Sequence, residues 1–346
     1  MAIIFSRIKN ETIYLDPRKG FEPQTVTSET RRDPLTGQIS RIFPFRNLTL
    51  HRHDWTPFVE ESLQKFCPFC PEVMEQVTPK FPAPITAAGR IRIGDAVAIP
   101  NLNPYDKHAA VVIMTDRHYV PMNEIDIQLI TDSFRAGLIY LQRAAAVDPD
   151  GARYCSINWN YMPYSGGSLI HPHLQVIAGP EPCTFDHRMI TASAMYTRNN
   201  KSNYWTDLVE TEAVSDQRYI GKTGRLHWLC AFAPRHVGEV LGIMPGRRTI
   251  DDITDQDLAE MSAGLINVIK YYERCNIASF NTALYLARRE DEGFTAHVRI
   301  VGRFTIFPLA GSDITHMQIL HDDPWTVIVP EVMAEDIKKT SHKPSP

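Results

Sequence analysis

The chain has 346 residues, of which 43% are hydrophobic and 22% charged, and its formal net charge is −4. This composition is typical of a globular protein with a sizeable core, and the length suits two domains or one duplicated domain. A net negative charge gives no overall attraction to nucleic acid or to an anionic membrane surface, so we expect neither as a partner.

No segment of the sequence is typical of export or of membrane insertion. The first ten residues, MAIIFSRIKN, contain a short apolar run but lack the cleavage site of a secretory signal. No stretch reaches the roughly 20 apolar residues of a spanning helix. The six cysteines do not resemble a disulfide framework in a chain of this length. We therefore expect a cytoplasmic protein with reduced thiols.

The N-terminal region is rich in turn signals and arginine. In the segment RRDPLTGQISRIFPFR (31–46), Pro34 presets one position of a tight turn and Gly37 relieves the last. The following residues 38–45 are typical of a strand. Residues 71–90 carry four prolines, so we expect them to form a loop next to a Cys-x-x-Cys motif at 67–70.

From residue 91 onward the pattern becomes regular, and its order occurs twice. Apolar spacing predicts strands and helices in the order strand, strand, helix, strand, strand. The first set comprises 92–102, 108–115, a helix over 124–146, 154–162 and 173–179. The second comprises 226–234, 239–245, a helix over 253–275, 278–287 and 296–304. We interpret this as an old duplication that gives an α+β fold with halves 1–205 and 206–346.

The Cys-x-x-Cys motif of Cys67 and Cys70 suits one corner of a tetrahedral zinc site. A redox dithiol is an alternative, but such a pair usually opens a helix, which the surrounding prolines do not suggest. No second Cys-x-x-Cys exists, so a zinc ion would need histidines or carboxylates to complete its shell. The candidate histidines are His118, His171, His173, His51 and His53. Two reduced cysteines in a loop remain the structural alternative.

A second cluster of interest lies in SGGSLIHPHLQVIAGP (165–180). Gly166, Gly167 and Ser168 form a small turn of the kind that cups a phosphate through backbone N–H groups. Gln175 lies two residues beyond His173, so strand alternation places both side chains on one face. A neutral amide there can bind a phosphate oxygen beside the imidazole.

The same alternation places His171 on the face of His173, although Pro172 between them favours the end of a strand over its middle. Imidazole is a competent covalent catalyst for phosphoryl and nucleotidyl groups. The residues alone therefore allow His173 to be a nucleophile, a metal ligand or a structural histidine.

Four separate motifs resemble one family. RRDPLTGQISRIFPFR (31–46), CPFCP (67–71), NWNYMPYSGGSLIHPHLQ (158–175) and its H-x-H-x-Q ending resemble the galactose-1-phosphate uridylyltransferases. This family is the nucleotidyltransferase branch of the histidine-triad superfamily. The resemblance covers most of the chain and implies a duplicated histidine-triad fold. In that fold, two half-barrel antiparallel sheets form one larger sheet with helices packed outside.

The resemblance also implies an activity. His173 would attack the α-phosphorus of a nucleoside diphosphate sugar, and the nucleotidyl group would then pass to a sugar 1-phosphate in a ping-pong cycle. The implied substrate contacts are Gln175 and Ser168 at the α-phosphate, Gly167 in their turn, Arg46 and then Arg31 at the phosphates, and Asn160 and Asn101 at the nucleotide. The implied ligands of a structural zinc ion are Cys67, Cys70, His118 and His171. A homodimer is implied as well.

The sequence departs from the family at two places. Some members bind a second metal through the second half, but here Arg299 stands near His297 where another histidine is expected. No glutamate follows Gln175 at the matching spacing, so the sequence does not support a second metal. The C-terminal segment 319–339 does not reproduce the sugar-contacting glutamate and glutamine, which leaves both the sugar and the base open.

Three alternatives to the uridylyltransferase activity follow. Relatives with the same core act as ADP-glucose phosphorylases or diadenosine tetraphosphate phosphorylases, in which inorganic phosphate is the acceptor. A histidine-triad hydrolase is disfavoured because that branch carries a histidine where Gln175 stands, and that histidine protonates the leaving group. A non-catalytic, zinc-stapled nucleotide-sugar binder is disfavoured because a binder needs neither His173 nor Gln175.

Overall fold

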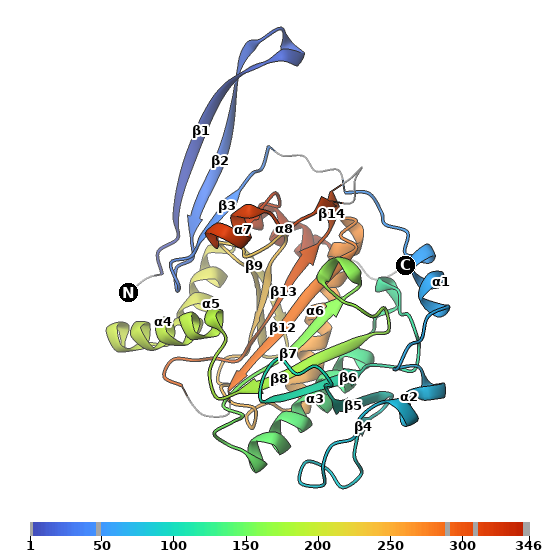
Figure 1. Cartoon of the computed structure of the whole chain (residues 1–346). Helices are drawn as coiled ribbons and strands as arrows, with labels where there is room; N and C mark the ends of the chain where they lie inside the picture. Colours follow the sequence, from blue (N-terminus) through green and yellow to red (C-terminus); the bar gives the residue numbers. More distant parts are fainter. Residues whose placement is uncertain (1–2, 46–49, 288–290, 307–310, 342–346) are drawn as a thin grey trace.

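The computed structural model describes residues 3–45, 50–287, 291–306 and 311–341 (Figure 1). Its centre is a ten-stranded antiparallel sheet with the strand order β4-β5-β6-β8-β7-β12-β13-β11-β10-β9. The strands are β4 (Ile91–Ile93), β5 (Ala96–Pro100), β6 (His108–Ile113), β7 (Tyr154–Tyr161), β8 (His173–Gly179), β9 (Tyr219–Thr223), β10 (Leu226–Cys230), β11 (Val240–Ile243), β12 (Ser279–Ala287) and β13 (His297–Arg303).

This sheet is symmetric about the β7–β12 pair at its middle. The first half, β4 to β8, and the second half, β9 to β13, have the same strand order read outward from that pair. Helix α3 (Ile127–Val147) connects β6 to β7, and α6 (Asp255–Arg274) makes the same connection from β11 to β12. The predicted α+β fold class with a repeated order of elements is confirmed. The predicted boundary at residues 205 and 206 stays a prediction, and it falls inside α5 (Tyr204–Ser215).

Helices α3 and α6 lie side by side on one face of the sheet, α3 against β4 to β8 and α6 against β9 to β11 and β13. Each helix begins at a residue that accepts a backbone N–H, Asp126 for α3 and Thr254 for α6. Thr254 and Asp257 form a complete capping box. The apolar stripes of both helices are buried in one continuous core, which holds the two halves together.

The opposite face of the sheet is covered differently in the two halves. Helices α4 (Thr184–Asn200) and α5 pack on the second half, where Met189, Trp205 and Leu208 contact buried side chains of β10 and β11. In the first half, a smaller apolar cluster of Met74, Ile99 and neighbouring side chains lies beside α2 (Pro71–Val77). The first half thereby keeps a cavity on this face.

The helix α2 differs from the predicted loop over residues 71–90. Pro71 occupies its first turn, where a missing N–H costs nothing and the fixed φ suits a helix, and Cys70 is its N-cap. Four prolines in twenty residues favoured a loop, but the first of them stands at the one position that starts a helix. Only residues 78–90 lack regular structure.

The remaining elements surround the sheet. A four-stranded sheet comprises β1 (Ser6–Asp16), β2 (Glu22–Arg32), β3 (Ile39–Ile42) and β16 (Trp325–Thr326), and its β1–β2 hairpin projects away from the body in Figure 1. The other elements are α1 (Thr56–Leu63), β14 (Thr305–Ile306), β15 (Gly311–Ser312), α7 (His316–His321) and α8 (Pro330–Ser341). Among the described helices, none combines the length and the hydropathy of a membrane span.

Candidate active site and metal cluster

A cluster of two cysteines and two histidines lies at one end of β6 and β8. The possible ligand atoms of Cys67, Cys70, His118 and His171 all lie within 4.8 Å of one another. The cysteines come from the segment before α2, His118 follows β6, and His171 precedes β8. The structure therefore brings together the four side chains that the resemblance implies as zinc ligands, and this cluster can hold a metal ion.

Outer hydrogen bonds fix which nitrogen of each histidine faces the thiols. His171 donates Nε2–H to the carbonyl of Thr115 at 2.8 Å, and its Nδ1 lies 3.6 Å from Cys67 Sγ. His118 Nε2 contacts Ser62 Oγ at 2.8 Å, while its Nδ1 lies 3.2 Å from Cys70 Sγ. Both rings thus present an Nδ1 lone pair to the cluster, as a metal-binding histidine does when its other ring N–H donates to a neighbouring group.

Burial keeps Cys70 and His171 of the cluster uncharged near pH 7. Burial, together with the neighbouring Cys67 thiol, raises the pKa of Cys70 to about 12. Burial also lowers the pKa of His171 to about 4, which keeps this imidazole neutral. A divalent cation would displace the thiol protons and compensate two buried thiolates. His53, which the sequence also offered as a ligand, instead packs against Trp55 and Tyr164.

His173 is the first residue of β8 and lines a cavity of about 280 Å³. It donates Nδ1–H to the carbonyl of His171 at 2.8 Å, so its Nε2 carries the lone pair. No described residue forms a hydrogen bond with this Nε2. Burial lowers the pKa of His173, so the ring is neutral near pH 7. The ring centroid of Phe69 lies 5.4 Å from that of His173.

The two histidines of the HPH motif have different neighbours. Strand β8 begins at His173, and the Met114 N–H donates to Pro172 O at 3.0 Å, which continues the β6–β8 ladder one residue beyond the pair of Ile113 and His173. The ring centroid of Phe69 lies 6.0 Å from that of His171 and 5.4 Å from that of His173, and the predicted common face stays a prediction. His171 points to the cysteines, whereas His173 points into the cavity.

Several predicted substrate contacts surround His173. Gln175, Ser168 and Asn101 line the same cavity, and no described residue hydrogen-bonds the side-chain amide of Gln175. Phe69, Ile99, Val111 and Leu169 provide apolar walls. The site thus combines an imidazole nitrogen that carries a lone pair, polar groups beside it and apolar walls.

Asn160 and Gly167 are not among the residues that line this cavity, although Gly167 directly precedes the lining residue Ser168. Continuing the register of Trp159 with Leu174 by one residue sets Asn160 opposite His173 on the same face. A Cβ on Gly167 would lie 3.4 Å from the carbonyl oxygens of Asn160 and Met162, a tight approach that favours glycine.

Of the two predicted arginines, Arg31 is not among the described residues that line the cavity. Arg31 is only 1% exposed and forms a double hydrogen bond, 2.9 Å in each arm, with the carboxylate of Glu331. It also donates to Glu29 at 2.9 Å. The geometry does not favour its predicted role at the phosphates, which stays a prediction. Arg46 lies outside the described residues.

No protein-family model matches the sequence. A protein of Archaeoglobus fulgidus described as uncharacterised is 32% identical over 311 residues, which cover 90% of this chain and 92% of that protein. This chain belongs to the same family as the archaeal protein.

Solved structures show which fold this family has. An ADP-glucose phosphorylase from Arabidopsis thaliana with bound ADP-glucose matches with a TM-score of 0.69 and 17% identity, over 90% of this chain and 99% of that one. A GalT-like protein from the same plant matches with a TM-score of 0.68 and 16% identity, over 90% of this chain and 98% of that one. A uridylyltransferase matches with a TM-score of 0.65 and 20% identity, over 91% of this chain and 99% of that one. The chain has the fold that these solved structures share.

Proposed function

We propose that this protein is a nucleotidyltransferase that moves a nucleoside monophosphate from a nucleoside diphosphate sugar to a sugar 1-phosphate. The reaction is of the hexose-1-phosphate uridylyltransferase type and passes through a nucleotidyl group on His173. The observation that carries the proposal is the orientation of His173, whose Nδ1–H donates to the His171 carbonyl while Nε2 faces the cavity.

The chemistry follows from that orientation. Nε2 attacks the α-phosphorus, the bond from that phosphorus to the bridging oxygen breaks, and the sugar 1-phosphate leaves with the electron pair. Because a phosphate monoester is a stable anion, it needs no proton from the enzyme, which agrees with an amide rather than an acid at Gln175. The positive charge that develops on the ring is stabilised by the short hydrogen bond from Nδ1–H to the carbonyl. An acceptor phosphate then reverses these steps.

We further propose that the cluster of Cys67, Cys70, His118 and His171 holds a structural zinc ion. Two thiolates and two imidazole nitrogens are the donor set of closed, four-coordinate zinc sites. The ion would staple the segment before α2 to the start of β8. Because His171 supplies both a cluster atom through Nδ1 and the carbonyl that orients His173, the cluster fixes the nucleophile through one residue.

A second candidate function differs only in the acceptor. The ADP-glucose phosphorylase neighbour supports a reaction in which inorganic phosphate accepts the nucleotidyl group. The first half-reaction and the role of His173 are the same in both candidates. The acceptor that removes a label from the enzyme therefore decides between them.

Incubation with nucleotide sugars labelled in the α-phosphate, in separate UDP, ADP and GDP series, tests the proposal. We expect a label on the protein that survives alkali and is lost in acid, as a phosphoimidazole is. His173→Ala removes it, and a matched control, His227→Ala in β10, retains it. Release by a sugar 1-phosphate supports a uridylyltransferase type, and release by inorganic phosphate alone supports a phosphorylase. Absence of label with every nucleotide sugar leaves a non-catalytic binder and contradicts the proposal.

The predicted homodimer and the cytoplasmic location stay predictions. Sedimentation equilibrium of the full chain measures the first directly.

A further inference from the structure

An asparagine from the second half contacts the candidate active site of the first half. Asn281 of β12 pairs with Asn160 of β7 across the middle of the sheet. Its Nδ2 donates to Asn160 Oδ1 at 2.7 Å and to the carbonyl of Ser165 at 2.8 Å. Asn160 lies opposite His173, and Ser165 begins the Gly-Gly turn that carries Ser168. One side chain therefore touches two parts of the site.

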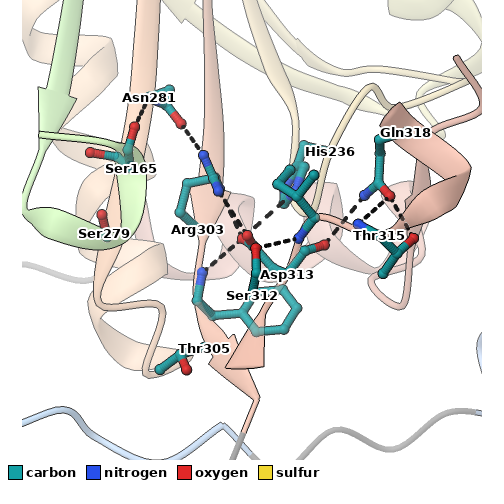
Figure 2. Close-up of polar contacts among 12 residues, drawn as sticks. Ser165, His236, Ser279, Asn281, Arg303, Thr305, Ser312, Asp313, Thr315 and Gln318 are labelled. Carbon is teal, nitrogen blue, oxygen red and sulfur yellow. Dashed lines mark hydrogen bonds and ion pairs between the residues drawn. The ribbon is translucent and has the colours of Figure 1, made fainter. Parts of the chain in front are cut away.

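The side-chain oxygen of Asn281 contacts an arginine that belongs to an ion pair with a buried carboxylate. Arg303 of β13 donates to Asn281 Oδ1 at 3.0 Å and forms two hydrogen bonds of 2.8 Å with the carboxylate of Asp313 (Figure 2). Asp313 is 1% exposed and also accepts from Phe304 N at 3.1 Å. Figure 2 shows Arg303 lying between Asn281 and Asp313.

The neighbours determine which way each amide points. A guanidinium only donates hydrogen bonds, so Asn281 must turn Oδ1 toward Arg303. The carbonyl of Ser165 only accepts, so Asn281 must turn Nδ2 toward it and toward Asn160. Asn160 then accepts this hydrogen bond through Oδ1, and its Nδ2–H₂ group faces away from Asn281. No described residue accepts from that Nδ2.

The turn over residues 162–165, to which Asn281 donates a hydrogen bond, has a strained backbone and is fixed by several other hydrogen bonds. Met162 has φ 66°, a left-handed conformation that is costly for a residue with a side chain. Ser165 Oγ donates to Met162 O at 2.7 Å, and Ser279 Oγ of β12 donates to Tyr161 O. Such conformations persist only where surrounding contacts over-determine them. Here, two of the contacts come from β12 in the second half.

We propose that Asp313, Arg303 and Asn281 form a positioning relay that makes Asn160 a hydrogen-bond donor toward a nucleotide phosphate and fixes the turn before Ser168. The inference rests on the proposed function, since it takes the α-phosphate as the ligand. The degenerate second half thereby contributes to catalysis in the first half without touching the reacting atoms.

Binding of UMP and AMP, each compared with its uncharged nucleoside, tests the relay by calorimetry on the full chain. We expect Asn281→Ala to weaken monophosphate binding about tenfold, the value of one charge-assisted hydrogen bond. Nucleoside binding should stay unchanged, because the apolar walls are intact. Asn200→Ala is the matched control, as this half-buried amide also donates to a backbone carbonyl, that of Tyr196.

Substitutions at Arg303 test the direction of the relay. Arg303→Lys keeps a side chain that only donates, so monophosphate affinity should stay within about threefold of wild type. Arg303→Met removes the donor and should match Asn281→Ala. If Asn281→Ala binds monophosphates as wild type does, or loses monophosphate and nucleoside equally, the relay is wrong. Failure of wild type to bind any monophosphate contradicts the relay and the proposed function together, whereas monophosphate binding without any covalent label contradicts the function alone.

Discussion

The two halves of the sheet each begin their last strand with a histidine, yet only one of these histidines faces a cavity. His173 opens β8 and His297 opens β13. Each donates Nδ1–H to the carbonyl two residues before it, at 2.8 Å for His173 and 2.9 Å for His297. Each also pairs with an isoleucine of a neighbouring strand, Ile113 of β6 or Ile243 of β11. The backbone geometry of the candidate nucleophile therefore exists twice.

The surroundings of His297 differ from those of His173. The ring of His297 is fully buried, with ring centroids of Trp205 and Tyr285 at 4.2 Å and 4.9 Å. Its Nε2 is buried and has no hydrogen-bond partner among the described residues. Arg299 stands at the position of Gln175 and donates to Glu239 at 2.6 Å. Burial, and then the charge of Arg299, lower the pKa of His297 to about 3.

The two halves share the backbone geometry of the strand that carries the histidine, but they differ in the side chains around it. Strand ends and their hydrogen bonds follow from the repeated topology, so both halves have them. The halves differ in what packs on the sheet beside each histidine. Trp205 of α5 fills the space beside His297, whereas the segment 67–70 and α2 leave a cavity beside His173. Among the described residues, the cysteine and histidine cluster occurs only in the first half, where its two cysteines lie in that segment.

The largest expected effect is on catalysis at His173. We expect His173→Ala to lower nucleotidyl transfer by about 10⁴-fold or more, since it removes the attacking atom. His297→Ala should retain the covalent label and lower the melting temperature instead, because it removes a stacked core ring. Steady-state rates and thermal melts of both variants measure the difference. Loss of label in His297→Ala with an unchanged melting temperature would contradict the comparison.

Removal of the metal should mainly destabilise the first half. We expect Cys67→Ser, or a strong chelator, to remove about one zinc per chain and to lower the free energy of unfolding by about 3 kcal/mol. Labelling of His173 should fall as well, since its carbonyl partner belongs to His171. Cys155→Ser is the control, because Cys155 is equally buried but lies outside the cluster. Elemental analysis and denaturant titration check both effects. Equal metal content in the two variants would rule out the cluster.

A smaller effect is expected at Gln175, the residue that Arg299 replaces in the second half. Gln175→Leu keeps the volume and removes the amide, so we expect kcat to fall about 100-fold, the cost of one donor at a developing phosphate charge. The half-buried amide of Gln142 on α3 lies away from the cavity, and Gln142→Leu should retain kcat. Pre-steady-state measurement of label formation separates this step from release. An unchanged rate in Gln175→Leu would remove the amide from the mechanism.

The smallest effect concerns the pH dependence of stability. His297 is neutral in the fold, with its pKa lowered to about 3, whereas it titrates near 6.5 when unfolded. As the pH falls below 6.5, His297 binds a proton in the unfolded state but stays neutral in the folded state. The free energy of unfolding therefore decreases as the pH falls toward 3. Between pH 7 and pH 5 we expect this residue to cost about 2 kcal/mol. Denaturant titrations of wild type and His297→Leu at both values should show a smaller loss in the variant, and parallel losses would contradict this account.

Parts of this molecule could be predicted from the sequence because they depend on local pattern. The strands and helices of both halves follow from apolar spacing, and the two cysteines and the HPH motif carry side chains whose chemistry is specific. The helix α2 was missed because proline was counted as a breaker without regard to its position at Pro71.

The rest depends on contacts between residues distant in the sequence. Asn281 bonds to Asn160 across 121 positions, and Arg31 bonds to Glu331 across 300. Nothing near Arg31 in the chain distinguishes an arginine that binds phosphate from one that is paired inside the protein. In the same way, only the packing of α5 shows that Trp205 covers His297.

Peptide mapping of the trapped covalent intermediate tests the central claim most directly. The full chain is incubated with UDP-glucose or ADP-glucose, quenched in alkali and digested, and the nucleotidyl adduct is located by tandem mass spectrometry. We predict one adduct, on the peptide that contains His173 and assigned to that residue, with the peptide that contains His297 unmodified. An adduct on any other residue, or none with either sugar nucleotide while the substrate is consumed, would contradict the account.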